Sequence, residues 1–213
     1  MMNYKINFFN MKTLVVKYLP SGEKSNTSKL LDLFIEKIKG KNCEVVDLIE
    51  NPAETFDLES MAAYYKRNYG GQKLNEIEEK SIAKQDKLKK QLLASDVLVM
   101  AYPMHNFGMP ARAKAYLDAV IMKGETFEPS KKLMAGKKAL TLFTSGGEYN
   151  HDAVNLDYPN WDTISMLAKI NFGYMGFDEA EVIGTSLRDQ SKQAEKLAQI
   201  DEQITQIVKK WYK

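Results

Sequence analysis

Residues 97–110 read Val97-Leu98-Val99-Met100-Ala101-Tyr102-Pro103-Met104-His105-Asn106-Phe107-Gly108-Met109-Pro110 and carry the clearest structural signal in the chain. The run from Val97 to Ala101 is entirely apolar, which is typical of a strand covered on both faces in a parallel sheet. Pro103 cannot donate to a sheet ladder and so ends the strand. Gly108 permits a turn, and Pro110 fits the first turn of a helix. This stretch therefore predicts a buried strand, a loop and a helix.

The loop of this stretch is a candidate ligand site. Open α/β sheets bind their ligands at the carboxyl ends of the strands. A polar asparagine flanked by methionine, histidine and phenylalanine suits a flat ligand with an apolar face and a hydrogen-bonding rim, and flavin fits that description. We therefore predict cofactor contacts from Pro103, Met104, His105, Asn106 and Phe107.

The rest of the chain alternates between predicted strands and helices. Apolar and β-branched runs predict further strands over residues 13–16, 43–48 and 139–143, and a fifth strand that ends at 181–184. Helical spacing predicts helices from residue 25 onward, over about 75–94, after residue 110, over about 159–175 with Trp161 among its apolar residues, and over about 189–211. The aromatic-rich residues 49–75 are expected to be irregular.

Five strands that alternate with helices imply right-handed crossovers and a doubly wound, parallel α/β sheet. The pattern alone leaves the strand order open between 2-1-3-4-5 and a dinucleotide-binding order. The first strand is not followed by G-x-G-x-x-G, and this argues against a dinucleotide site.

Length and charge limit the possible functions. The 213 residues favour one domain, predicted over 11–213, and Met11-Lys12-Thr13-Leu14 would make a normal protein start. Residues 1–10 are therefore expected to be a disordered extension. The 30 basic and 28 acidic residues give a net charge of +2, so neither a nucleic acid nor a membrane is an expected partner.

Cysteine and histidine usage adds further limits. Cys43 stands alone, so one chain can form neither a disulfide nor a thiolate metal site. His105 and His151 are the only histidines, and no metal is predicted. Neither a membrane-spanning run nor a signal peptide is recognisable, so we expect a soluble, cytoplasmic protein.

A polar cluster follows the first predicted strand. Ser25, Asn26, Thr27 and Ser28 place three hydroxyls and one amide on the first turn of a helix, where free backbone N–H groups attract anions. The cluster therefore suits a phosphate monoester. An ordinary N-cap would explain one of these residues equally well, and both interpretations stay open at this motif.

A glycine-rich segment follows the fourth predicted strand. In Thr144-Ser145-Gly146-Gly147, the glycines let the backbone approach a planar ligand, and successive N–H groups suit a pyrimidine-like edge. A plain turn is the alternative. Tyr149 and His151 are candidates to cover the ligand or donate a proton, or they are simple surface groups. Because the three loops follow parallel strands, we expect them to converge on one ligand.

These motifs together resemble a known family, the FMN-dependent NADH azoreductases, also called FMN-dependent NADH:quinone oxidoreductases. The similar segments are residues 17–34, 47–52, 103–107, 123–127 and 136–147. The resemblance runs from about Met11 to the C-terminus. It implies a flavodoxin-like fold with strand order 2-1-3-4-5, tightly bound FMN, NADH or NADPH as reductant, and a homodimer with flavin sites at the interface.

The resemblance also implies roles for the motifs. The family's flavin loop falls on Met104 to Phe107, its phosphate segment on Ser25 to Thr27, and its Gly-Gly segment on Ser145 to Gly147. The chain departs from the family twice. Tyr18 and Leu19 stand where relatives often have a phosphate-binding serine, and His105 replaces the usual tyrosine. The aromatic segment 56–69 is then expected to be a lid contributed across the dimer.

The expected activity is two-electron, ping-pong hydride transfer from NADH or NADPH through FMN to a quinone or an azo compound. Because the flavin carries the redox chemistry, no protein nucleophile is assigned. His105 either contacts the cofactor as a flat side chain or donates a proton to the acceptor. A one-electron flavodoxin and a flavin-free binding or regulatory protein of the same fold are the alternatives.

Overall fold

A five-stranded parallel sheet forms the centre of the computed structural model, which describes residues 11–39, 41–149 and 161–213. The strand order is β2-β1-β3-β4-β5. This confirms the predicted fold class and the flavodoxin-like order. The strands are β1 (Thr13–Lys17), β2 (Cys43–Asp47), β3 (Val97–Pro103), β4 (Lys138–Thr144) and β5 (Glu179–Thr185).

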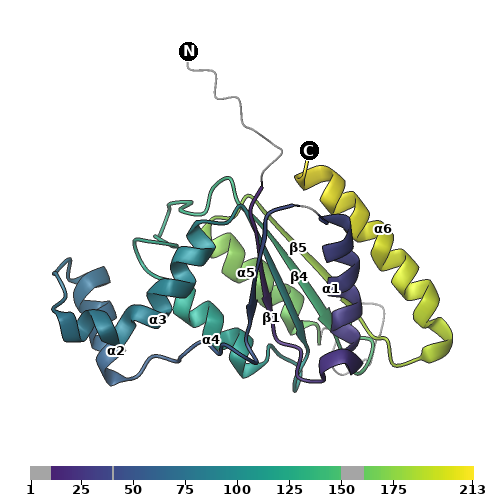
Figure 1. Ribbon diagram of the computed structural model, residues 1–213, viewed down its shortest axis with the longest axis horizontal. Helices are drawn as coiled ribbons and strands as arrows, with labels where there is room; N and C mark the ends of the chain where they lie inside the picture. Colours follow the sequence, from purple (N-terminus) through teal and green to yellow (C-terminus); the bar gives the residue numbers. More distant parts are fainter. Residues whose placement is uncertain (1–10, 40, 150–160) are drawn as a thin grey trace, which may run out of the picture.

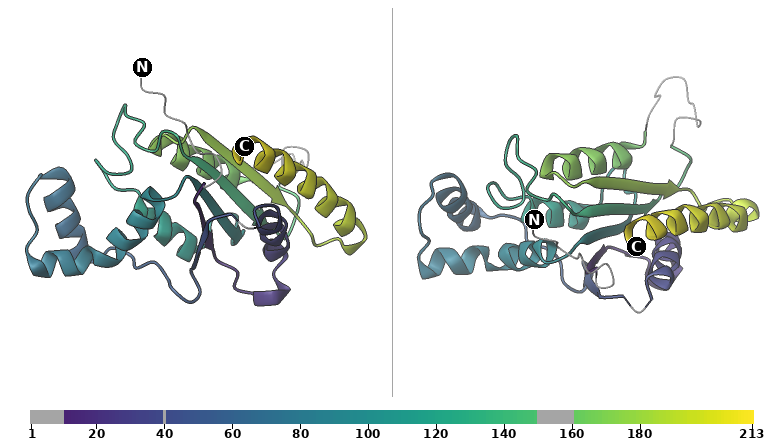
Figure 2. Two further views of the ribbon diagram at one scale, coloured as in Figure 1. Left: turned by 45° about the horizontal axis from the view of Figure 1, so that its top comes forward. Right: turned by 90° about the horizontal axis from the view of Figure 1, so that it is seen from above.

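Helices cover both faces of the sheet. The α-helices are α1 (Asn26–Lys37), α2 (Leu58–Tyr64), α3 (Glu76–Leu93), α4 (Ala111–Val120), α5 (Thr163–Met175) and α6 (Gln193–Trp211). Helices α1 and α6 lie side by side on one face, and α3, α4 and α5 lie on the other (Figures 1 and 2). The described chain also has short 3-10 turns at Gly22–Lys24 and Gln190–Lys192.

The alternation of side chains along the strands separates two apolar cores. In β1, Leu14 and Val16 belong to the core beneath α3, α4 and α5, whereas Val15 belongs to the core beneath α1 and α6. Strand β3 repeats the pattern, because successive side chains of a strand point to opposite faces. All three β1 residues are buried, which explains why the central strands of this sheet, such as β1 and β3, read as nearly continuous apolar runs.

The expectation that residues 49–75 are irregular was wrong for residues 58–69, which are helical. Helix α2 begins at a capping box in which the Ser60 N–H donates to the Asp57 carboxylate and the Asp57 N–H donates to the Ser60 hydroxyl. It runs directly into a π-helix at Tyr65–Tyr69. We call α2 and this π-helix, residues 58–69, the arm. The arm and part of α3 project beyond the sheet, at the left of Figure 1.

A charge network fastens the arm to the body. The guanidinium of Arg67 donates to both Asp86 oxygens, at 2.7 and 2.9 Å, and lies 3.2 Å from Glu125. The ammonium of Lys89, whose side chain is only 5% exposed, pairs with Asp86 at 2.7 Å and with Glu125. Burial raises the pKa of Asp86, but the hydrogen bonds from Arg67 and Lys89 outweigh burial and hold this pKa below its usual value.

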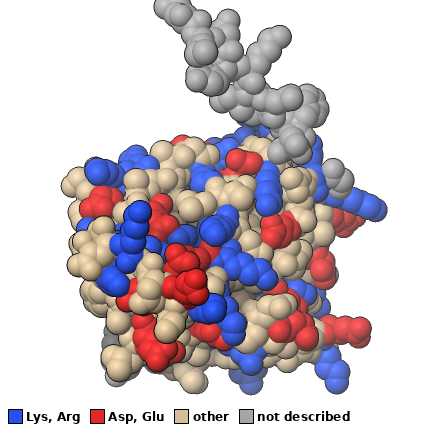
Figure 3. All heavy atoms as spheres, turned by 60° about the vertical axis from the view of Figure 1, so that its left-hand side comes forward, with Lys and Arg blue, Asp and Glu red and all other residues tan. Residues whose placement is uncertain are grey.

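The face that carries the arm shows Lys and Arg side chains mixed with Asp and Glu side chains (Figure 3). Ion pairs such as Lys66 with Glu78 join neighbouring charges of opposite sign there. An extended field of one sign does not build up on a surface of this kind.

Candidate functional site

Side-chain and backbone hydrogen bonds join the loops at the carboxyl edge of the sheet. The hydroxyls of Thr27 and Thr144 are 2.7 Å apart and buried, which ties the start of α1 to the end of β4. The Met104 N–H donates to the Thr144 carbonyl at 2.8 Å, which ties the β3 loop to the same point. Three segments that are far apart in the sequence therefore meet at Thr144.

The start of α1 is capped by its first serine. Ser25 is the N-cap, and its hydroxyl accepts a long hydrogen bond of 3.4 Å from the Ser28 N–H, so the N-cap interpretation is correct for this residue. Ser25 and Thr27 are buried, whereas Asn26 is partly exposed. The remaining N–H groups of the first turn have no partner within the helix, so the positive end of the helix is available to an anion.

The β3 loop closes in a two-residue hairpin. The His105 N–H donates to the Gly108 carbonyl at 3.0 Å, and the Gly108 N–H donates back at 2.9 Å. The two central residues, Asn106 and Phe107, have φ values of 47° and 62°, the signs of a type I′ turn. The turn was predicted to depend on Gly108, but the left-handed positions belong to Asn106 and Phe107. Asparagine tolerates this backbone conformation, whereas phenylalanine is strained in it.

The rings of Phe107, Tyr149 and Trp161 form a cluster that we call the aromatic corner. The Phe107 centroid lies 4.5 Å from that of Trp161 and 5.6 Å from that of Tyr149, at interplanar angles of 85° and 68°. Tyr149 and Trp161 are nearly parallel, at 18°. Trp161 was predicted within a helix, but α5 begins at Thr163, behind the N-cap Asp162, and the tryptophan precedes it.

The segment after β4 is held from several sides. The Ser145 hydroxyl donates to the Gly147 carbonyl at 2.7 Å, and the Ser145 N–H donates to the Thr185 carbonyl at 3.0 Å. Glu148 pairs with Lys196 of α6. A Cβ built on Gly146 would have no atom within 4 Å, so open space adjoins this glycine.

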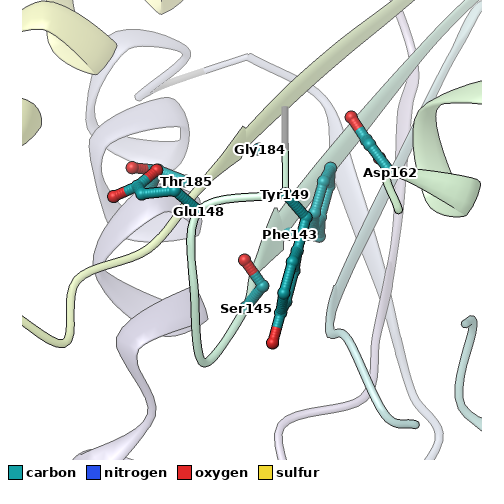
Figure 4. Close-up of a pocket in the computed structure, with 7 residues that line it drawn as sticks. All are labelled: Phe143, Ser145, Glu148, Tyr149, Asp162, Gly184 and Thr185. Atoms are coloured by element: carbon teal, nitrogen blue, oxygen red, sulfur yellow. The ribbon is translucent and has the colours of Figure 1, made fainter. Parts of the chain in front are cut away.

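A small hollow of about 30 Å³ lies behind Tyr149 at the ends of β4 and β5 (Figure 4). A volume of this size holds a water molecule but not a ligand. Gly184 forms one wall, and a Cβ at this position would overlap the ring of Phe143. The exposed ring of Phe107 and the open side of Gly146 lie outside this hollow.

Tyr18 is a residue that the sequence did not identify as part of the site. Its ring lies edge-on to that of His105, with centroids 5.9 Å apart. The two residues follow β1 and β3, neighbouring strands at which the order of the sheet changes direction. Ligands of doubly wound sheets bind in the crevice at such a switch point.

Other predicted features find a place or lie outside the description. Pro103 ends β3 opposite Thr144, as predicted. His151 and residues 1–10 lie outside the described residues. Within the described residues, no group of three or more His, Cys, Asp or Glu side chains is arranged to hold a metal ion. None of the described helices is long and apolar enough to cross a membrane.

Hydrogen-bond donors and apolar groups lie together at the carboxyl edge of the sheet. An anion cradle at α1, a flat apolar surface at Phe107 and an open glycine backbone at Gly146 lie on three joined loops. This arrangement can bind a planar molecule that carries a phosphate tail.

Comparisons with known proteins give a consistent result. Residues 11–208 match the model of a family described as having a flavodoxin-like fold. The chain is 30% identical over 205 residues to an FMN-dependent NADH:quinone oxidoreductase of Shewanella loihica, covering 92% of this chain and 98% of the relative. It is also 30% identical over 184 residues to the protein of that name from Psychromonas ingrahamii, covering 84% of this chain and 82% of the relative.

Solved structures show the same fold. An FMN-dependent NADH-azoreductase of Bacillus anthracis, solved in complex with FMN, superposes with a TM-score of 0.76 at 21% identity, covering 92% of this chain and 99% of that one. A quinone reductase structure from Klebsiella pneumoniae gives a TM-score of 0.65 at 18% identity, covering 93% of this chain and 85% of that one.

Proposed function

The chain belongs to the FMN-dependent NADH:quinone oxidoreductases, a family with a flavodoxin-like fold, and we propose that it transfers two electrons from NADH or NADPH to a quinone or an azo compound. FMN supplies the redox-active ring when it is bound, so that donor and acceptor are used in turn, in a ping-pong sequence. The protein's part is to bind and orient the cofactor and the substrates and to exclude solvent from the site.

The phosphate of the cofactor is proposed to bind at the start of α1. Ser25, Asn26 and Thr27 supply hydroxyl, amide and backbone N–H donors around the positive end of the helix. The chain has no serine at position 18 to add a further donor, since Tyr18 stands there. Binding of the phosphate therefore depends on the helix start, without an arginine or lysine among the proposed contacts.

The ring of the cofactor is proposed to lie between the β3 loop and the segment after β4. Residues Pro103 to Phe107 form the apolar side, and Thr144, Ser145, Gly146 and Gly147 form the polar edge. The single observation that carries the proposal is the buried Thr27–Thr144 hydroxyl contact, since it fixes the phosphate segment against the glycine segment. In this proposal, the remaining lone pairs of the two hydroxyls and the backbone N–H groups of both segments face one ligand rather than two separate ones.

No side chain of the chain is assigned as an acid or a base. Tyr149 packs into the aromatic corner, where its ring contacts Phe107 and Trp161. The exposed ring of His105 is supported by Tyr18 at its edge. Both placements favour a packing role, and a proton for the reduced acceptor can come from water.

The decisive experiment is the absorbance spectrum of the purified protein, followed by stopped-flow reduction with NADH and with NADPH and reoxidation by a quinone. We expect flavin absorbance, bleaching by at least one nicotinamide and rapid recovery with the quinone. A flavin-bearing protein that neither nicotinamide reduces would instead be a one-electron carrier. A colourless protein without affinity for FMN would be a binding or regulatory protein.

We also propose that the protein is a homodimer, because apolar side chains gather on one outer surface. Met166, Leu167, Ile170 and Tyr174 lie on one side of α5, and each is more than a third exposed. Tyr174 stacks on Phe127 at 4.8 Å, and Lys123 lies over the Tyr69 ring of the arm at 4.9 Å. Side-chain contacts thus run from α5 through residues 123–127 to the arm.

An exposed apolar surface of this extent is typical of a protein contact. Tyr65 and Tyr69 of the arm are each about half exposed, which supports the proposal that segment 56–69 covers an active site across the dimer. A cytoplasmic location is proposed as well, because the single cysteine, Cys43, excludes a disulfide within one chain.

A further inference from the structure

Phe107 is held in an unfavourable state in two respects. Its φ of 62° is a left-handed backbone conformation that costs a bulky residue of the order of 1–3 kcal/mol. Its side chain is 46% exposed, although it is large and apolar. A residue that is strained and also presented to solvent is most simply explained by contact with a ligand.

Neighbouring groups fix this conformation. The Thr163 hydroxyl, at the start of α5, donates to the Phe107 carbonyl. The planes of the Trp161 and Tyr149 rings are nearly parallel to each other and steeply inclined to the plane of the Phe107 ring. The three rings therefore form an L-shaped corner. A Cβ on Gly147 would lie 3.1 Å from the Tyr149 ring, so the glycine allows this ring to lie close to the backbone.

We propose that Trp161 is a specificity-determining residue that completes, with Phe107 and Tyr149, the surface on which the planar conjugated ring of the electron acceptor packs. The inference rests on the proposed function and deepens it. Aromatic rings attract one another most in offset or edge-to-face arrangements, and a corner of perpendicular rings offers both to one flat ligand.

The charges of the adjoining loops favour a neutral ring over a charged ligand. The Asp162 carboxylate accepts the Ser165 N–H of α5 at 2.9 Å, and Glu148 pairs with Lys196. Both carboxylates are thus engaged outside the aromatic corner. The corner itself consists of uncharged rings, which select by shape and π-contact.

The test compares Trp161→Leu, which keeps apolar bulk, with Trp161→Phe, which keeps a ring. Both FMN-saturated variants are assayed with 1,4-naphthoquinone, a planar two-ring acceptor, and with hexacyanoferrate(III), an octahedral ion without a ring face. We expect Trp161→Leu to raise the KM for naphthoquinone by roughly three- to tenfold, the range of one lost aromatic contact, while Trp161→Phe restores most of the loss. The KM for hexacyanoferrate(III) should not change.

Measuring the reductive and the oxidative half-reaction separately identifies which ring, nicotinamide or quinone, packs against Trp161. Slower reoxidation by naphthoquinone with unchanged reduction by NADH supports the acceptor assignment, whereas a defect confined to NADH reduction overturns it in favour of the nicotinamide ring. An unchanged KM in Trp161→Leu, or weaker FMN binding alone, also overturns it. A wild-type protein that does not reduce even hexacyanoferrate(III) would refute the proposed function instead.

Tryptophan fluorescence gives a reading that does not depend on turnover. The chain has two tryptophans, and Trp211 is 1% exposed, with its indole N–H bonded to Glu179. Naphthoquinone added to the oxidised protein without NADH should quench the Trp161 emission, defined as the difference between wild type and Trp161→Phe. Equal quenching in both proteins would show that the quinone does not contact Trp161, and would overturn the inference.

Discussion

The ring of Tyr18 meets the ring of His105 edge to face across the crevice between β1 and β3, with centroids 5.9 Å apart and planes at 77°. Both residues depart from the sequence pattern that the chain otherwise resembles. The two positions that the resemblance marks as departures therefore contact each other in the structure.

His105→Tyr tests whether the imidazole titrates during turnover. Because the Tyr18 contact requires only a flat ring, we expect the variant to keep the rate of quinone reduction and its pH profile. Tyr18→Phe, which keeps the supporting ring, is the matched control. Loss of a limb of the pH profile near neutrality in His105→Tyr alone would identify His105 as a proton donor.

The double variant Ser25→Ala/Thr27→Ala tests the phosphate assignment. A hydrogen bond to a charged group is worth about 1.5–3 kcal/mol, so losing two should weaken FMN binding by about a hundredfold or more. Riboflavin, which lacks the phosphate, should lose much less affinity, and its loss measures the separate effect of breaking the Thr27–Thr144 contact. Ser21→Ala, an exposed residue whose side chain caps nothing, is the control. Calorimetric titration that shows equal losses for both ligands would exclude this assignment.

Lys89→Met tests the fastening of the arm. The substitution keeps the buried aliphatic part of the side chain but removes the ammonium group that pairs with Asp86 and Glu125. Because these carboxylates are 19% and 30% exposed, the expected loss of unfolding free energy is about 1–3 kcal/mol, below the value for a fully buried pair. Hydrogen exchange should rise over residues 58–69. Lys84→Met, from an exposed pair with Glu54, should change both measurements little, and the same effect in both variants would disprove a specific role for Lys89.

Acid should release the same network. The pKa of Asp86 is lowered in the folded protein, so its contribution to stability is complete above the unfolded value of about 4 and is lost as the pH falls through the lowered folded pKa. We expect exchange over residues 58–69 to increase below about pH 4. Asp86→Asn should show faster exchange already at neutral pH and less change on acidification. A wild-type profile that stays flat down to global unfolding would contradict the prediction.

Ile170→Asp tests the proposed dimer surface. Ile170 is 56% exposed at the middle of the apolar side of α5, and a carboxylate there would be buried without a partner on association. Sedimentation velocity at micromolar concentration should show a dimer for wild type and a monomer for the variant. Ala198→Asp places the same charge on the exposed side of α6 and should stay dimeric. A fully active wild-type monomer would refute the proposal itself.

The sequence predicted the sheet well because buried parallel strands leave continuous apolar runs, as in Val97 to Ala101. It failed for the arm, whose aromatic residues are half-buried or exposed and leave no apolar stripe of helical spacing. The Asp57 and Ser60 of the capping box were the available signal.

Contacts within the site were less predictable than its loops. Tyr18 meets His105 only because β1 pairs with β3 in a register that sets Lys17 beside Ala101. The Trp161 ring contacts the Phe107 ring only because α5 begins two residues after Trp161. Neither the register of strands nor the first residue of a helix can be read from a pattern with that accuracy.

The contact of Phe143 with Gly184 has a consequence for how this chain can diverge. The Phe143 ring occupies the space that any side chain at position 184 would need. A single substitution at 184 would displace the ring, and Phe143 directly precedes Thr144 of the site. A larger residue at 184 therefore requires a smaller residue at 143, and an alignment of homologues should show a larger residue at 184 only where 143 is small.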